Sequence, residues 1–144
     1  MLNEYGYVVN VDAAVLGDGE YLLIERSAEE DHAAGALAFP GGKVEQSPGG
    51  ENTVSETARR EVREEVGVEI DAVEYVTSRT FEADTGTPCL NLVTCCEYAG
   101  GEAHPREPEE VAAVHWLTPA EIRAHESVPP YIRDYLDAIE RHRR

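Results

Sequence analysis

Lysine is almost absent from this 144-residue chain, where Lys43 is the only lysine among twelve basic residues. Basic residues are outnumbered by 29 acidic ones, so the formal net charge is −17. Binding to a phosphate backbone depends on clustered Lys and Arg, and a field of this sign repels polyanions. The composition therefore predicts that the protein has no nucleic-acid partner.

An acidic chain with so little lysine is similar in composition to proteins of salt-loving microbes. Salt screens repulsion between like charges on a protein surface. We therefore expect a halophilic protein whose stability falls when salt is removed.

Cysteine and histidine are few, and neither has the spacing of a disulfide framework or a zinc site. The cysteines, Cys89, Cys95 and Cys96, form no CxxC pair, and their odd number argues against structural disulfides. The five histidines show no helical HxxxH spacing. We therefore expect buried strand thiols and assign no metal to the histidines.

Long apolar runs are also absent, which excludes a membrane helix of about 20 residues. The first basic residue is Arg26, so we do not expect a signal peptide with a positively charged start. These features favour a cytoplasmic protein without a membrane partner. The length favours a single domain over residues 1–144 with one hydrophobic core.

Apolar periodicity and turn residues predict an alternation of strands and helices along the chain. Strands are expected at residues 7–15, 21–24, 68–81, 90–98 and 111–116, with hairpin turns at 17–19 and 84–88. A loop at 27–35 precedes a short apolar piece, 36–39, which ends at a Pro-Gly-Gly turn at 40–42. Helices are expected at 53–66, at 119–125 and after the prolines at 129–130. This order predicts an α+β or mixed α/β layered domain.

The helix at 53–66 has start and stop signals at its two ends. Thr53 and Glu56 match a capping box, and Gly67 occupies the position where a C-terminal glycine is expected. One apolar stripe recurs every four residues, at Val54, Ala58, Val62 and Val66.

Three glutamates, Glu61, Glu64 and Glu65, share one face of this helix because they are spaced i, i+3 and i+4. We call them the helix carboxylates. Like charges at these spacings repel, so the face needs ion pairs or a bound cation. Arg60 is spaced to pair with Glu56 or Glu64, which would make a solvated, salt-bridged face. Two features favour a site instead, since Glu65 adjoins the apolar stripe and the Pro-Gly-Gly segment could bring a backbone carbonyl nearby.

The stretch from Arg60 to Val68, Arg-Glu-Val-Arg-Glu-Glu-Val-Gly-Val, resembles the second half of the Nudix hydrolase box at every fixed position. The preceding Phe39-Pro40-Gly41-Gly42-Lys43-Val44-Glu45 is similar to the segment that opens the box. One departure is that Gly42 and Arg60 lie four residues further apart than in the family. The insertion leaves open whether Glu51 or Asn52 takes the place of the first box glutamate.

The resemblance extends over most of the chain and implies a Nudix-like mixed sheet sandwiched between helices. It implies Mg²⁺ (or Mn²⁺) as cofactor, with Glu61 and Glu65 as chief ligands, supported by Glu64 and the Gly42 carbonyl, and with Arg60 orienting the glutamates. A glutamate ahead of the last strand often joins such a site, and among Glu107, Glu109 and Glu110 we favour Glu110. Lys43 is as consistent with a phosphate contact as with an ordinary surface charge.

The function implied is hydrolysis of a pyrophosphate bond in a nucleoside diphosphate linked to another group. The general base is left open among Glu64, Glu65 and Glu110, and the substrate within this class is also open. Aromatic residues that could stack a base, namely Phe39, Tyr75 and Phe81, are more simply read as core. A non-catalytic nucleotide sensor and an isopentenyl diphosphate isomerase are the alternatives, and the family's frequent homodimers make a dimer compatible with the sequence.

Overall fold

The computed structural model describes residues 2–28 and 34–144. In chain order its elements are α1 (Leu2–Tyr5), β1 (Val8–Gly17), β2 (Glu20–Arg26), β3 (Leu37–Ala38), β4 (Gly41–Lys43), α2 (Thr53–Val66), β5 (Glu69–Glu82), β6 (Pro88–Gly100), β7 (Val111–Leu117), α3 (Pro119–Ala124) and α4 (Pro130–His142). Both expected hairpins and the three expected helices are present. Of the loop expected at 27–35, positions 29–33 lie outside the described residues.

Strand β1 is the centre of a seven-stranded sheet with the order β3-β2-β1-β6-β5. It runs parallel to β6 from Val8 to Leu16, whereas β2 and β4 pair with it antiparallel. Strand β7 extends the sheet by pairing with β2. The sheet is therefore mixed, as expected for a Nudix-like fold.

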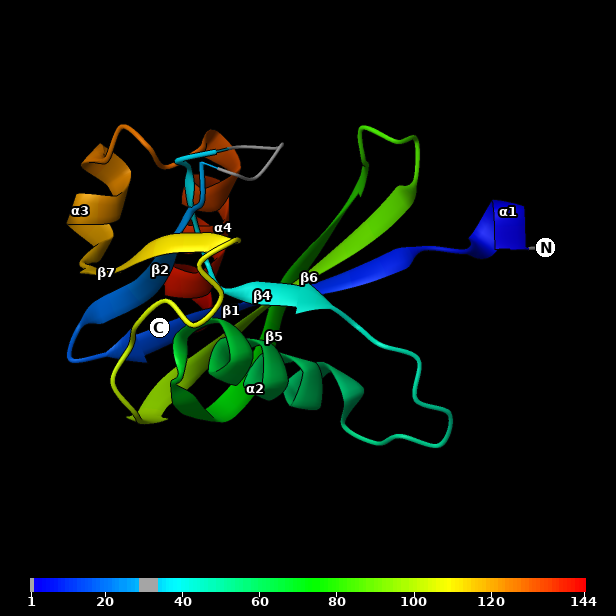
Figure 1. The fold of residues 1–144 in the computed structure, drawn as a ribbon, viewed down its shortest axis with the longest axis horizontal. Coiled ribbons are helices and arrows are strands. Elements are labelled where there is room, and N and C mark those ends of the chain that lie inside the picture. The colour runs from blue at the N-terminus through cyan, green and yellow to red at the C-terminus, as the bar shows by residue number, and fades with distance from the viewer. Residues whose placement is uncertain (1, 29–33) are drawn as a thin grey trace.

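Helices cover both faces of this sheet (Figure 1). Successive β1 side chains point to opposite faces, so Val11 and Val15 pack with Val62 of α2, while Ala14 belongs to the core under α4. The α4 core includes Ile132 and Leu136, both of which are fully buried. The expected arrangement of a sheet between helices is confirmed.

Two local predictions are wrong. The Pro-Gly-Gly segment is not a turn, because Gly41–Lys43 forms β4 against β1, and a Cβ on Gly41 would lie 2.3 Å from the Val11 carbonyl oxygen. Thr53 is not the cap of α2 either, because Asn52 takes that place with φ 52° and no side-chain hydrogen bond. The helix therefore begins one residue before the position that the Thr53–Glu56 pattern indicates.

The three cysteines are buried and free, as expected for strand thiols. Within residues 2–28 and 34–144, no helix is both long and apolar enough to cross a membrane.

Candidate active site

Helix α2 presents the helix carboxylates at different depths. Ala58, Val62 and Val66 are fully buried against the sheet, and Glu65, beside this stripe, is only 5% exposed. The side chain of Glu61 is 17% exposed and that of Glu64 is exposed. The predicted burial of Glu65 thus follows from its place next to the apolar stripe.

Strand β4 lies directly against these side chains. The Gly41 N–H donates a hydrogen bond of 2.8 Å to Oε1 of Glu65. A Cβ on Gly42 would lie 2.3 Å from the carboxylate carbon of Glu61, so any larger residue there would have to displace that carboxylate. The expected approach of this backbone to the helix is therefore present, although the group that meets Glu65 is an N–H and not a carbonyl.

Arg60 joins α2 to the end of β4. Its Nη2 donates to the Lys43 carbonyl at 2.9 Å and to Oε1 of Glu61 at 3.0 Å. Its Nη1 lies 3.6 Å from Oε2 of Glu45. Neither of the helical pairs allowed by spacing, with Glu56 or Glu64, forms among the described residues. Arg60 therefore holds the Glu61 carboxylate through a charge-assisted hydrogen bond.

The segment after β6 is fastened to the end of α2. Gly67 ends the helix with φ 72° and donates its N–H to the Arg63 carbonyl. The backbone N–H groups of His104 and Arg106 donate to the carbonyls of Val66 and Glu65. These bonds satisfy carbonyls that a helix C-terminus leaves without partners. They also place the following residues, 107–110, beside the helix carboxylates.

Five carboxylates consequently repel one another at the end of α2. Burial raises the pKa of Glu65 to about 8; the Gly41 hydrogen bond opposes this, and Glu61, Glu110 and Glu107 add to it. Burial also raises the pKa of Glu61, with Arg60 opposing and Glu64 and Glu110 contributing. The pKa of Glu107 is raised by burial and then by Glu110. The structure therefore brings both Glu107 and Glu110 to the helix carboxylates, whereas Glu109 acts on Glu107.

This donor set fits a hard divalent cation. The candidate ligand atoms are carboxylate oxygens, and a bound cation would relieve the repulsion between them. Among the residues that the structure describes, one group of three His, Cys, Asp or Glu ligand atoms lies within 4.8 Å of one another, and it lies elsewhere. The carboxylate oxygens at the end of α2 therefore do not form a closed cage. Magnesium commonly keeps waters and substrate phosphates in its coordination shell, so an open carboxylate face suits it.

A cavity of about 470 Å³ adjoins the helix carboxylates, and its lining includes Glu65 and Gly41. Its polar floor is formed by Asn10, Asp12 and Asn91, linked by hydrogen bonds of 2.7 to 3.1 Å. Burial raises the pKa of Asp12 to about 6, and the amides of Asn91 and Asn10 oppose this shift. Sequence reasoning missed this trio, although an aspartate inside an apolar strand is a signal of a buried polar partner.

The aromatic residues considered for base stacking differ in position. Phe81 is 49% exposed and lines the cavity, as does Tyr131, which sequence reasoning did not consider. Phe39 lines the cavity from the core and is 3% exposed. Tyr75 is exposed and lies outside the cavity lining.

The two candidates for the first box glutamate lie before the first turn of α2. Asn52 is the cap residue, and Glu51 is exposed. Arg60 instead pairs with Glu45, a residue that sequence reasoning left out of the site. The Lys43 side chain is exposed, and its carbonyl accepts the Arg60 hydrogen bond.

Two curated proteins that are similar to this chain are hydrolases by name. A CTP pyrophosphohydrolase of Escherichia coli (strain K12) is 32% identical over 124 residues, which are 85% of this chain and 84% of that protein. An NAD-capped RNA hydrolase, NudC, of Stutzerimonas stutzeri (strain A1501) is 38% identical over 99 residues. That match covers 69% of this chain and only 32% of the relative, so the chain spans about a third of NudC's length.

Solved structures show the same fold. A MutT protein from Methanosarcina mazei Go1 has a TM-score of 0.77 and 27% identity, with 96% of each chain covered. The MutT NUDIX hydrolase from Burkholderia pseudomallei has a TM-score of 0.76 and 25% identity, with 92% of this chain and 97% of that one covered. The NUDIX domain family model matches residues 6–138. The predicted family is thereby confirmed, and the chain belongs to the Nudix hydrolase family.

Proposed function

We propose that this protein hydrolyses a pyrophosphate bond in a nucleoside diphosphate linked to another group, with Mg²⁺ or Mn²⁺ as cofactor. The observation that carries the proposal is that Glu65, one of the helix carboxylates, also lines the cavity, together with Gly41, whose N–H is bonded to it. A cavity of about 470 Å³ falls within the range of small-molecule sites. The similarity to a CTP pyrophosphohydrolase supports a nucleotide as substrate.

Glu61 and Glu65 are the chief metal ligands in this proposal, with Glu64, Glu110 and the Gly42 carbonyl completing the set. Arg60 is the positioning residue for Glu61, and the Gly41 N–H holds one oxygen of Glu65. A cation bound by these residues would neutralise charge on the phosphate oxygens and on the leaving oxygen, and would offset the repulsion that a protein with a net charge of −17 exerts on an anionic substrate.

The reaction adds one water across a P–O–P linkage. A water oxygen forms a bond to one phosphorus, the bridging P–O bond breaks, and both products carry phosphate. The water loses its proton to a carboxylate, and the candidates for this general base are Glu64, Glu65 and Glu110. The reaction needs no oxidant or reductant, because no atom changes its oxidation state.

A nucleotide panel tests the reaction directly. The purified full-length protein is incubated in molar KCl with canonical and oxidised dNTPs, ADP-ribose, NADH and diadenosine polyphosphates, with Mg²⁺ or with EDTA. Mg²⁺-dependent cleavage of any nucleotide in the panel supports the proposal and identifies the substrate class. Saturable nucleotide binding without cleavage overturns it in favour of a sensor.

Glu65→Gln tests the site. The substitution keeps the size of the side chain and its acceptor for the Gly41 N–H, but removes the charge that would bind the cation. We expect Mg²⁺-dependent turnover to fall by orders of magnitude, with an unchanged circular dichroism spectrum. Glu56→Gln is the matched control, because Glu56 is exposed in the first turn of the same helix. Equal turnover in both variants would refute the assigned site.

A further inference from the structure

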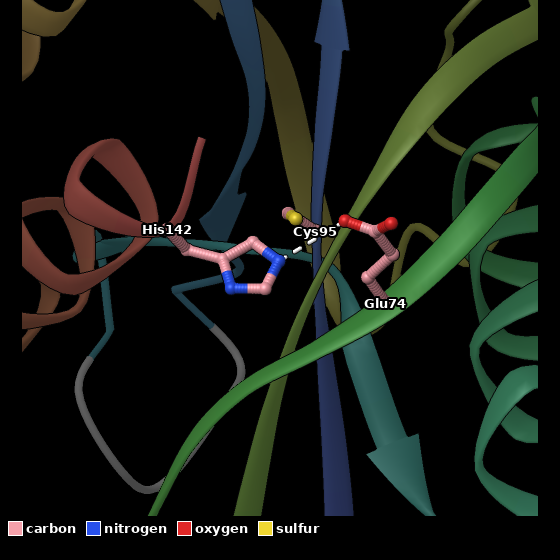
Figure 2. Close-up of side chains that lie close together, drawn as sticks. All are labelled: Glu74, Cys95 and His142. Atoms are coloured by element: carbon pink, nitrogen blue, oxygen red, sulfur yellow. Dashed lines mark hydrogen bonds and ion pairs between the residues drawn. The ribbon is translucent and has the colours of Figure 1, made fainter. Parts of the chain in front are cut away.

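A second group of potential ligands lies on the other side of the sheet from α2. Glu74 comes from β5, Cys95 from β6 and His142 from the last turn of α4 (Figure 2). One ligand atom from each lies within 4.8 Å of the other two. The His142 Nε2 is 3.0 Å from Oε1 of Glu74.

The fold brings these three residues together from distant parts of the sequence. Glu74 and Cys95 are direct partners in the antiparallel β5–β6 ladder, so their side chains project from the same face. Cys95 packs in the core under α4, whereas its neighbour Cys96 packs in the core under α2. The last turn of α4 lies over this face and places His142 opposite the pair (Figure 2). None of the three residues lines the 470 Å³ cavity.

We propose that Glu74, Cys95 and His142 form a binding site for a zinc-class transition metal, separate from the Mg²⁺ site. The donors are one thiolate sulfur, one imidazole nitrogen and one carboxylate oxygen, which is a set that Zn²⁺ accepts in tetrahedral geometry. A hard ion such as Mg²⁺ disfavours sulfur, so the two sites differ in metal preference. Neighbouring ligand atoms around tetrahedral zinc lie about 3.5 Å apart, so small side-chain rotations close this cluster.

The surroundings of the cluster are compatible with a cation. The C-terminal end of a helix carries partial negative charge, and His142 lies in the last turn of α4. Burial raises the pKa of the Cys95 thiol and Glu74 adds to this, whereas Arg143 opposes it. The Arg143 guanidinium is already bonded to Tyr21 and Glu140. The side chains of Glu74 and His142 are 64% and 34% exposed, so solvent can supply a fourth ligand. A metal here would fasten α4 to β5 and β6.

Cobalt binding tests the proposal, because a cysteine thiolate bound to Co²⁺ gives a charge-transfer absorption that carboxylate ligands do not give. The experiment uses untagged full-length protein stripped with a chelator, with excess Mg²⁺ present to occupy the carboxylate site. We expect one equivalent of Co²⁺ to produce the thiolate band and one equivalent of Zn²⁺ to remove it. Absence of the band overturns the proposal.

Single substitutions assign the ligands. Cys95→Ser is expected to abolish the band, and His142→Ala to weaken Co²⁺ binding at least tenfold. Cys89→Ser is the matched control, because Cys89 is also a buried β6 thiol but lies outside the cluster. A band that persists in Cys95→Ser, or disappears in Cys89→Ser, contradicts the assignment. Since His142 is near the surface, its variant keeps the test decisive if Cys95→Ser does not fold.

Discussion

At Gly42, the addition of a single methyl group tests the candidate active site most directly. A Cβ there would meet the carbon and both oxygens of the Glu61 carboxylate at 2.3 to 2.6 Å. We expect Gly42→Ala to displace that carboxylate and to lower Mg²⁺-dependent turnover at least a hundredfold. Gly100→Ala is the matched control, because Gly100 also lies in a strand and a Cβ on it would meet no atom within 4 Å. The measurement is kcat and the Mg²⁺ concentration for half-maximal rate, and equal values in both variants would contradict the prediction.

Asp12 is expected to give the protein a pH-dependent stability. Its pKa rises from an ordinary 3.8 to about 6 on folding, so the folded state binds the proton more tightly than the unfolded state. The free energy of unfolding therefore falls as pH rises from about 4 to about 6, by at most about 3 kcal/mol from this group.

Substitution with asparagine isolates this effect. Urea unfolding of wild type and Asp12→Asn across that pH range is expected to show a shallower fall in the variant. Asp18→Asn, in the exposed turn between β1 and β2, serves as the control and is expected to keep the wild-type slope. A parallel pH dependence of wild type and Asp12→Asn would sink the prediction.

Sequence spacing predicted which residues of the candidate site lie together only where they share one element. Glu61, Glu64 and Glu65 share a face because helical periodicity fixes it. Glu45 and Asp12 were missed, because their contacts with Arg60 and Asn91 depend on how separate segments pack. Glu110 was in range by sequence, but its proximity to Glu61 and Glu65 depends on the bonds between residues 104–106 and the end of α2.

At the scale of elements, the end of α2 is where we expect helix stability and the candidate active site to be connected. Gly67 has φ 72°, and a Cβ there would lie 2.7 Å from Cε1 of His104. We expect Gly67→Ala to lower the free energy of unfolding by more than the roughly 1–2 kcal/mol typical of left-handed backbone strain. It is also expected to raise the Mg²⁺ requirement, because the segment carrying Glu107 and Glu110 would move away from α2.

The control for Gly67→Ala separates backbone strain from contact. Gly19 has φ 80° but open space around its Cβ position, so Gly19→Ala has the strain without the clash. Urea unfolding and Mg²⁺ titration of activity are measured for both variants. If Gly19→Ala changes the Mg²⁺ requirement as much as Gly67→Ala does, the proposed connection is wrong.

Most helices and strands followed from local sequence, whereas strand β4 and the cap residue of α2 did not. The apolar stripe and Gly67 were sufficient to predict α2 at residues 53–66. The β4 strand was missed because Pro-Gly-Gly is typical of turns, and its extended form depends on pairing with β1. The structure instead has a capping box at Thr118 and Glu121 of α3, where both reciprocal bonds form.

For the whole molecule, a net charge of −17 predicts a strong salt dependence of stability. Repulsion between surface carboxylates is screened as ionic strength rises, because the Debye length falls from about 10 Å at 0.1 M to about 3 Å at 1 M. We expect the melting temperature to rise from low to molar KCl, with a smaller rise in sucrose of equal osmolality. A melting temperature independent of KCl would exclude a halophilic character.

The central pairing of β1 with β6 also determines when the folding protein gains its catalytic activity. Asn10 and Asn91 face each other in that pairing and are 81 positions apart in the sequence. The β1–β2 ladder, in contrast, joins residues that are close in the sequence, Leu16 with Tyr21 and Gly17 with Glu20. Long-range pairings form slowly, because chain entropy must be lost before the contact is gained. Strand β4, with its glycines at the carboxylates, depends on β1 for its place. In a refolding experiment, recovery of catalysis would therefore coincide with the slow closure of the sheet and lag behind formation of the helices.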